Sequence, residues 1–140
     1  MKKFKNHTLE KYLEVLAARE PVLGGGSAAA MTAALGAGLI SMVTQYSLKK
    51  GSPAPVERRL EKILRTSERL RQEFLGIVDL DAQAYLTVVR TRKGPRRAHQ
   101  VALRRAAKVP QQLSQLCSQA IDLTPFLVLK GNKYLLSDVE

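Results

Sequence analysis

The chain has 140 residues, which is enough for one hydrophobic core and too few for two independent ones. Hydrophobic residues make up 45 % of it and aromatic residues only 5 %, which excludes wholesale disorder and predicts an aliphatic core of the kind that suits helices. Lys and Arg number 23 against 12 Asp and Glu, and the net charge of +11 predicts attraction to nucleic acid, a lipid surface or a polyanionic small molecule.

Helical periodicity dominates the sequence, whereas strand signals are scarce. A first helix is predicted from about Thr8 to Arg19, with Thr8 as the cap of its first turn and Pro21 as the residue that ends it. Its apolar side chains recur at three- and four-residue spacing and are expected to face inward: Leu9, Tyr12, Leu13 and Leu16.

The glycine turn Gly24-Gly25-Gly26-Ser27 comes next, and a second helix is predicted from Ala28 to about Lys49. This stretch carries no charge before Lys49 and is long enough to span a bilayer, for example from about Leu23 to Val43. Its Ala, Gly, Ser and Thr content makes transfer into lipid weak. We therefore favour a helix buried on all sides within a helical bundle over a membrane span.

Two longer helices are predicted in the middle of the chain. The first runs from about Val56 to Arg92, with Gly76 as its expected bend point. A break at Lys93-Gly94-Pro95 precedes the second, from about Arg97 to Ala120, which Pro110 should kink or split in two.

The last part of the chain contains a short apolar piece from Phe126 to Leu129 and a turn at Gly131-Asn132, both residues that tolerate left-handed backbone. The final residues, Ser137-Asp138-Val139-Glu140, have the S-x-x-E pattern of a capping box, which begins a helix. We therefore expect a truncated chain that stops where a further helix would start.

Asp81 lies near the centre of the apolar stripe of the long middle helix, among Phe74, Ile77, Val78 and Tyr85, which are expected to face the core. Asp79 points about 160° away and is expected to be solvated. A carboxylate that faces a core costs several kcal/mol unless it is paired or protonated. A raised pKa or a cationic partner would suit a general acid or base near neutral pH. The alternative is a structural Asp satisfied by a hydroxyl, an amide or an Arg of another helix.

The segment Gly24–Ser27 is a second candidate site, because glycines allow close approach and the start of a helix favours an anion. The segment lacks the Gly-Lys-Ser/Thr ending of a Walker A loop, and a flexible turn is the alternative. A third candidate is a basic cluster that could bind phosphate or form a solvated face: Arg90, Arg92, Lys93, Arg96, Arg97, Arg104, Arg105 and Lys108.

The cysteine and histidine inventory is small. Cys117 stands alone, which excludes an internal disulfide and a Cys-rich zinc site. His7 and His99 give little support for a metal site or a Ser-His-Asp triad, so no metal is expected. The basic start of the chain has no apolar stretch behind it, which predicts a cytoplasmic protein.

Four short motifs together resemble those of a known family. Residues 20–30 look like its PGGGS-Ala-Ala motif, residues 79–85 like D-x-D-A-x-A-[FY], residues 106–110 like its Ala-rich turn ending in Pro, and Gly131-Asn132 with residues 137–139 like GN…SD-V. This is the cyclodeaminase/cyclohydrolase family, which comprises the C-terminal domain of formiminotransferase-cyclodeaminase and stand-alone methenyltetrahydrofolate cyclohydrolases. Leu23 stands where the family usually has Pro.

The resemblance implies an all-α, up-and-down helical bundle that forms a homodimer, here as a single domain over residues 1–140 without the family's C-terminal helix. It implies a folate substrate, either 5-formiminotetrahydrofolate or 5,10-methenyltetrahydrofolate, and neither metal nor cofactor. It places the catalytic carboxylate on Asp81. It implies that the substrate is bound by Gly24, Gly25, Gly26, Ser27, Asn132, Ser137 and Asp138.

Two other functions remain open at this stage. A non-enzymatic basic module could bind nucleic acid through the cluster from Arg90 to Lys108, although no aromatic residues are interleaved there for base stacking. A protein with one membrane span from about Leu23 to Val43 is the other. We favour the folate enzyme and expect neither nucleic acid nor a membrane as its partner.

Overall fold

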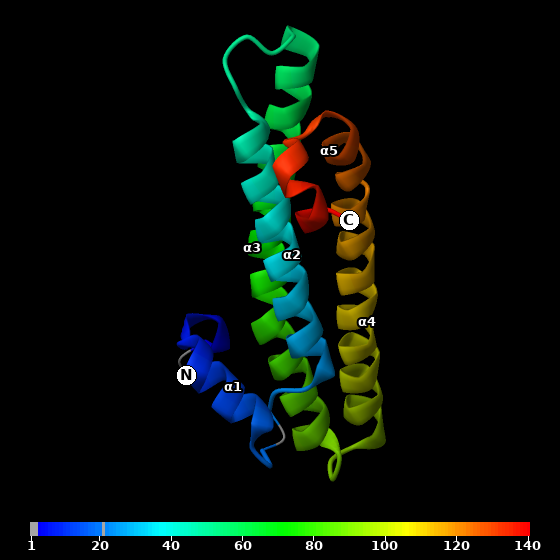
Figure 1. The fold of residues 1–140 in the computed structure, drawn as a ribbon. Coiled ribbons are helices and arrows are strands. Elements are labelled where there is room, and N and C mark those ends of the chain that lie inside the picture. Colours follow the sequence, from blue (N-terminus) through cyan, green and yellow to red (C-terminus); the bar gives the residue numbers. More distant parts are fainter. Residues whose placement is uncertain (1–2, 21) are drawn as a thin grey trace. The chain divides into compact units, whose positions relative to one another are not determined.

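The computed structural model describes residues 3–20 and 22–140, and in these residues all regular structure is helical (Figure 1). The all-α class is therefore confirmed. The predicted end of the first helix at Pro21 lies outside the described residues. In chain order the elements are η1 (Phe4–Asn6), α1 (Leu9–Ala17), α2 (Gly25–Ser47), α3 (Ala54–Thr91), α4 (Arg96–Ile121), α5 (Thr124–Lys130) and η2 (Lys133–Asp138).

The chain divides into two compact units. The first unit comprises the described residues up to Thr32 together with Phe74–Gln115, and the second comprises Ala33–Glu73 with Leu116–Glu140. The expected single domain over residues 1–140 stays a prediction.

In the first unit, α1 begins as its sequence predicts. The Thr8 side chain accepts a hydrogen bond from the Lys11 backbone N–H at 3.1 Å, which satisfies one of the free donors of the first turn. Tyr12 is buried as predicted, but Leu9 and Leu13 are exposed. The inward stripe predicted for this helix is therefore wrong for these two leucines, because only the Tyr12 side of α1 is covered.

The part of α3 that lies in the first unit carries the core side chains Phe74, Ile77, Val78 and Ala82, all buried. Tyr85 is 46 % exposed, so its predicted place in the core is wrong. The prediction that Asp79 is solvated is also wrong, because this residue is only 7 % exposed and its carboxylate accepts a hydrogen bond from the Phe4 N–H at 2.6 Å. Phe4 of η1 thus covers a second face of α3 at Asp79.

The two long helices are continuous at the glycine and the proline, whereas the bend predicted at Gly76 and the kink predicted at Pro110 stay predictions. α3 continues through Gly76 as one α-helix. α4 likewise continues through Pro110, so the predicted alternative of two helices is wrong. Proline removes one backbone hydrogen bond, and the turns on either side of it keep the helix together.

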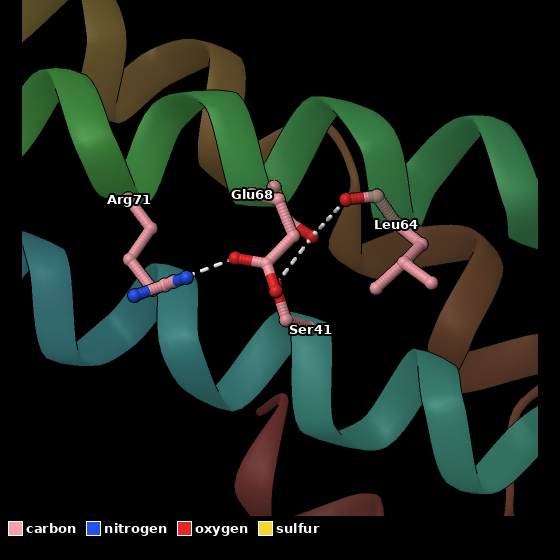
Figure 2. Close-up of polar contacts among 5 residues, drawn as sticks. Ser41, Leu64, Glu68 and Arg71 are labelled. Carbon is pink, nitrogen blue, oxygen red and sulfur yellow. Dashed lines mark hydrogen bonds and ion pairs between the residues drawn. The ribbon is translucent and has the colours of Figure 1, made fainter.

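In the second unit, α2, α3 and α5 bury apolar side chains against one another. The fully buried residues include Val43, Leu60, Ile63, Leu70 and Leu127. A buried polar contact accompanies them, in which the hydroxyls of Ser41 and Ser67 lie 2.8 Å apart and Ser67 donates to the Leu64 carbonyl (Figure 2). Arg71 pairs with Glu68 at 2.6 Å beside this contact.

α2 is not buried on all sides, which corrects the prediction. Leu35 is 64 % exposed and Tyr46 is 66 % exposed, and Leu39 lies on the same face of the helix. Among the described residues, α2 is the one helix that is both long enough and apolar enough to cross a membrane. Of its most apolar stretch, 39 % is buried. A core helix passes the same test, so the finding is weak support for a membrane span.

The turn after α5 differs from its prediction. Gly131 has φ −77° and ψ −177°, which is extended and not left-handed. A Cβ at Gly131 would collide with the Leu127 carbonyl, so close backbone approach explains why glycine suits this position. The helix start predicted at Ser137 is also wrong, because Ser137 lies inside η2 and the capping side chain is that of Asn132, which accepts from the Tyr134 N–H.

Candidate active site

A cavity of about 490 Å³ lies within the first unit, where the start of α2 meets α3 and α4. The glycine turn, the middle of the D-x-D motif and the Ala-rich motif therefore share one cavity. Its lining consists of Glu20, Leu23, Gly24, Gly25, Gly26, Asp81, Ala84, Tyr85 and Ala106.

Gly26 is the point of closest approach between α2 and Asp81. A Cβ built on Gly26 would lie 2.5 Å from Asp81 Cγ and 2.7 Å from its Oδ2, with Oδ1 closer still. A Cβ on Gly24 or Gly25 would meet nothing within 4 Å. Of the three glycines, only Gly26 is therefore required to be without a side chain for the Asp81 carboxyl to sit at the start of α2.

The Asp81 carboxyl accepts a hydrogen bond from the Ser27 backbone N–H. Burial raises the pKa of Asp81 above its usual value of 3.8, and the bond from Ser27 opposes that rise by stabilising the charged form. The net effect is a raised pKa. Asp81 therefore combines the two features that a general acid or base needs, which are access to a cavity and a proton affinity above that of a solvated carboxylate.

The free N–H groups at the start of α2 were expected to hold an anionic part of a ligand. Asp81 occupies part of this position instead, because its carboxylate already bonds to Ser27. The helix start thus holds the protein's own anion, and Gly25 and Gly26 of the same helix start line the cavity together with Asp81. The substrate-binding roles of Gly24, Gly25, Gly26 and Ser27 stay predictions.

The Ser27 side chain points away from the cavity. It is fully buried, and its hydroxyl lies 3.0 Å from the Tyr12 hydroxyl of α1. Ser27 does not line the cavity and contacts Asp81 through its backbone. Tyr12 was identified from the sequence only as an apolar position, and its hydrogen bond ties α1 to the first turn of α2.

Asn132, Ser137 and Asp138, the other residues implied to bind substrate, lie in the second unit. The backbone N–H of Asn132 donates to Ser47 Oγ at 2.8 Å, and its side-chain amide donates to the Tyr46 carbonyl at 3.4 Å. Asn132 thus fixes the loop after α5 onto the end of α2. Its proposed contact with substrate, like those of Ser137 and Asp138, stays a prediction.

Five of the nine lining residues were not assigned to the site from the sequence, and two of these five, Glu20 and Tyr85, have polar side chains. Glu20 is the acidic residue just before the glycine motif, and this position was its only signal. Tyr85 was assigned to the core because it follows the apolar stripe of α3, yet it lines the cavity. Within residues 3–20 and 22–140, no group of three or more His, Cys, Asp and Glu side chains is placed to hold a metal ion.

Comparison with known proteins gives a consistent result. The sequence model of a family described as formiminotransferase-cyclodeaminase matches residues 8–140. A methenyltetrahydrofolate cyclohydrolase from Methylorubrum extorquens is 34 % identical over 95 % of this chain and 69 % of that protein. The formimidoyltransferase-cyclodeaminase of Rattus norvegicus is 29 % identical over 95 % of this chain, which spans about a quarter of the rat protein (26 %).

A solved structure shares the fold. The crystal structure of a formiminotetrahydrofolate cyclodeaminase from Thermotoga maritima superposes with a TM-score of 0.92 and 27 % identity. The superposition covers 96 % of this chain and 68 % of that one.

Proposed function

This chain belongs to the formiminotransferase-cyclodeaminase family, and we propose that it catalyses a one-carbon reaction of tetrahydrofolate. One reaction is the lyase reaction of a cyclodeaminase, which closes 5-formiminotetrahydrofolate to the methenyl compound and releases ammonia. The other is the hydrolase reaction of a cyclohydrolase, which opens 5,10-methenyltetrahydrofolate with water. The observation that carries the proposal is the Asp81 carboxyl held at the start of α2 beside a cavity.

Asp81 has one role common to both reactions. In the cyclodeaminase reaction, a substrate nitrogen attacks the formimino carbon, and the carboxylate removes the proton from that nitrogen and returns it to the departing ammonia. In the cyclohydrolase reaction, the carboxylate removes a proton from the water that attacks the methenyl carbon. Its raised pKa makes the accepted proton easier to hold between the two steps.

The test replaces Asp81 by Asn, which keeps the shape of the side chain and removes its ability to exchange a proton. We expect both rates to fall by about 10²- to 10⁴-fold, the usual contribution of a general acid or base. The matched control is Asp122→Asn, an exposed carboxylate in the second unit. Rates in the Asp81 variant equal to those of the control would remove Asp81 from the mechanism.

We also propose that the enzyme works as a homodimer. The exposed apolar face of α2, formed by Leu35, Leu39 and Tyr46, supports this proposal because a second copy could remove it from water. Sedimentation analysis tests it. Leu39→Lys is expected to shift the protein to monomers, whereas Leu9→Lys, at an exposed position of α1, is expected to leave the dimer intact. A monomeric parent protein would refute this proposal.

We propose further that the protein is cytoplasmic and uses neither metal nor cofactor. A single cysteine, Cys117, forms no internal disulfide, which is compatible with a reducing compartment. Proton transfer by Asp81 requires no metal in either reaction. Unchanged rates after exhaustive treatment with a chelator are the expected result.

A further inference from the structure

The charge of the Asp81 cavity is opposite to that of the chain. The sequence carries 23 Lys and Arg, yet the two charged residues that line this cavity, Glu20 and Asp81, are both acidic. In the part of the chain that the structure describes, no basic side chain lines it. A cavity of this character attracts a positively charged or hydrogen-donating group of a ligand and repels an anionic one.

The two carboxylates are not equivalent. Asp81 is half-buried and bonded to Ser27, so it already balances the positive end of α2. Glu20 is exposed within the connection between α1 and α2, and its side chain makes no hydrogen bond or ion pair with any residue that the structure describes. The local fold therefore does not use the charge of Glu20, which is available to a ligand in the cavity.

The one-carbon units of the two proposed substrates share one chemical property. Each contains a carbon between two nitrogens, and the methenyl bridge is a delocalised N–C–N cation. A formimino group that takes up a proton becomes an amidinium of the same kind. A formyl group on the same nitrogen has the same oxidation level and no charge. A carboxylate beside the reacting carbon therefore discriminates between these groups by charge.

We infer that Glu20 is a specificity-determining residue, which together with Asp81 selects folates whose one-carbon unit is an amidinium cation. The inference rests on the proposed function and adds a residue and a charge criterion to it. Glu20 binds the delocalised cation in its ground state, whereas Asp81 exchanges the proton. Glu20 is thus expected to affect the affinity for the ligand more than the rate of the bound complex.

The experiment measures the dissociation constants of 5,10-methenyltetrahydrofolate and 5-formyltetrahydrofolate in an Asp81→Asn background, in which turnover of the methenyl compound is expected to be slower by about 10²- to 10⁴-fold. Adding Glu20→Gln is expected to weaken binding of the methenyl compound about fivefold, the upper range for an exposed ion pair, and to leave that of the formyl compound unchanged. Glu20→Lys should reduce the preference further. The control is Glu10→Gln, at an exposed position of α1 outside the cavity. It changes the net charge by the same amount as Glu20→Gln and is expected to alter neither dissociation constant.

The outcomes separate this inference from the proposed function. If both folates bind and the ratio of their affinities is the same in the Glu20 and Glu10 variants, the role of Glu20 is wrong and the folate site stands. If neither folate binds to the parent protein, the proposed function is wrong and the inference is refuted with it. A preference that declines in the Glu20 variants alone supports both.

Discussion

The contact between Gly26 and Asp81 allows a sharp test of the site, namely Gly26→Ala. The new methyl carbon would lie 2.5 Å from Asp81 Cγ. Because two carbon atoms rest at about 3.5–4.0 Å, the carboxyl group must retreat by about 1 Å. That movement displaces the carboxyl group, which is the proposed general acid or base, from the start of α2 and stretches its hydrogen bond from the Ser27 N–H.

A displacement of about 1 Å in a catalytic group costs on the order of 10²-fold in rate. We therefore expect kcat of Gly26→Ala to fall by about 100-fold. The fold should tolerate the change, because alanine is favoured over glycine within a helix by about 1 kcal/mol, which offsets part of the strain. The rate effect thus comes from the position of Asp81 and not from unfolding.

The assay follows the absorbance of the methenyl compound as it is formed or opened, with circular dichroism to verify the helical content. Gly76→Ala is the matched control, since it adds the same methyl group at an exposed position of α3 in the same unit, outside the cavity lining, where nothing lies within 4 Å. This variant is expected to keep its activity. Equal rates in the two variants would refute the geometry that places Asp81 against Gly26.

Three other outcomes follow from the first unit. Tyr12→Phe leaves the buried hydroxyl of Ser27 without its partner and should lower the free energy of unfolding in urea by about 1–3 kcal/mol, whereas an unchanged midpoint would contradict that bond. Because burial raises the pKa of Asp81, the folded state binds its proton more tightly, so the wild type should lose stability relative to Asp81→Asn as the pH rises from 3.8 through the raised folded value. A constant difference across that range would contradict the shift. Asp79→Ala should speed hydrogen exchange of the Phe4 amide about 10- to 100-fold, and equal exchange would show that the 2.6 Å bond does not protect it.

The positions of the helices could be predicted because their boundaries are set by local chemistry. Thr8 caps α1 as its hydroxyl predicts, and α3 begins two residues before the predicted Val56. Burial could not be predicted as well, since it depends on what covers each face. A single apolar stripe on α3 assigns Asp79 to solvent and Tyr85 to the core. Both assignments fail, because Phe4 of η1 covers Asp79 and a cavity opens beside Tyr85.

The candidate site was predictable in part for the same reason. Asp81 stood out because a carboxylate within an apolar stripe is costly, and Gly24–Gly26 because three successive glycines are unusual in an ordinary turn. Their meeting in one cavity needed the structure. Glu20 could not be assigned from the sequence, since an exposed acidic residue before a turn has no periodic signal.

The meeting of Asp81 with the start of α2 has a consequence for proton transfer. A carboxylate has two oxygens, so one can accept the Ser27 N–H while the other takes up or releases a proton in the cavity. Two effects act on the pKa of Asp81 in opposite directions. The positive end of α2 stabilises the charged carboxylate and lowers the pKa, whereas burial destabilises the charged form and raises it. Substrate binding excludes water and strengthens both effects, because each acts through a lower local dielectric. In the proposed mechanism, the close approach at Gly26 thus places the carboxyl group that exchanges the proton, whereas burial and the Ser27 N–H set how readily it gives the proton up.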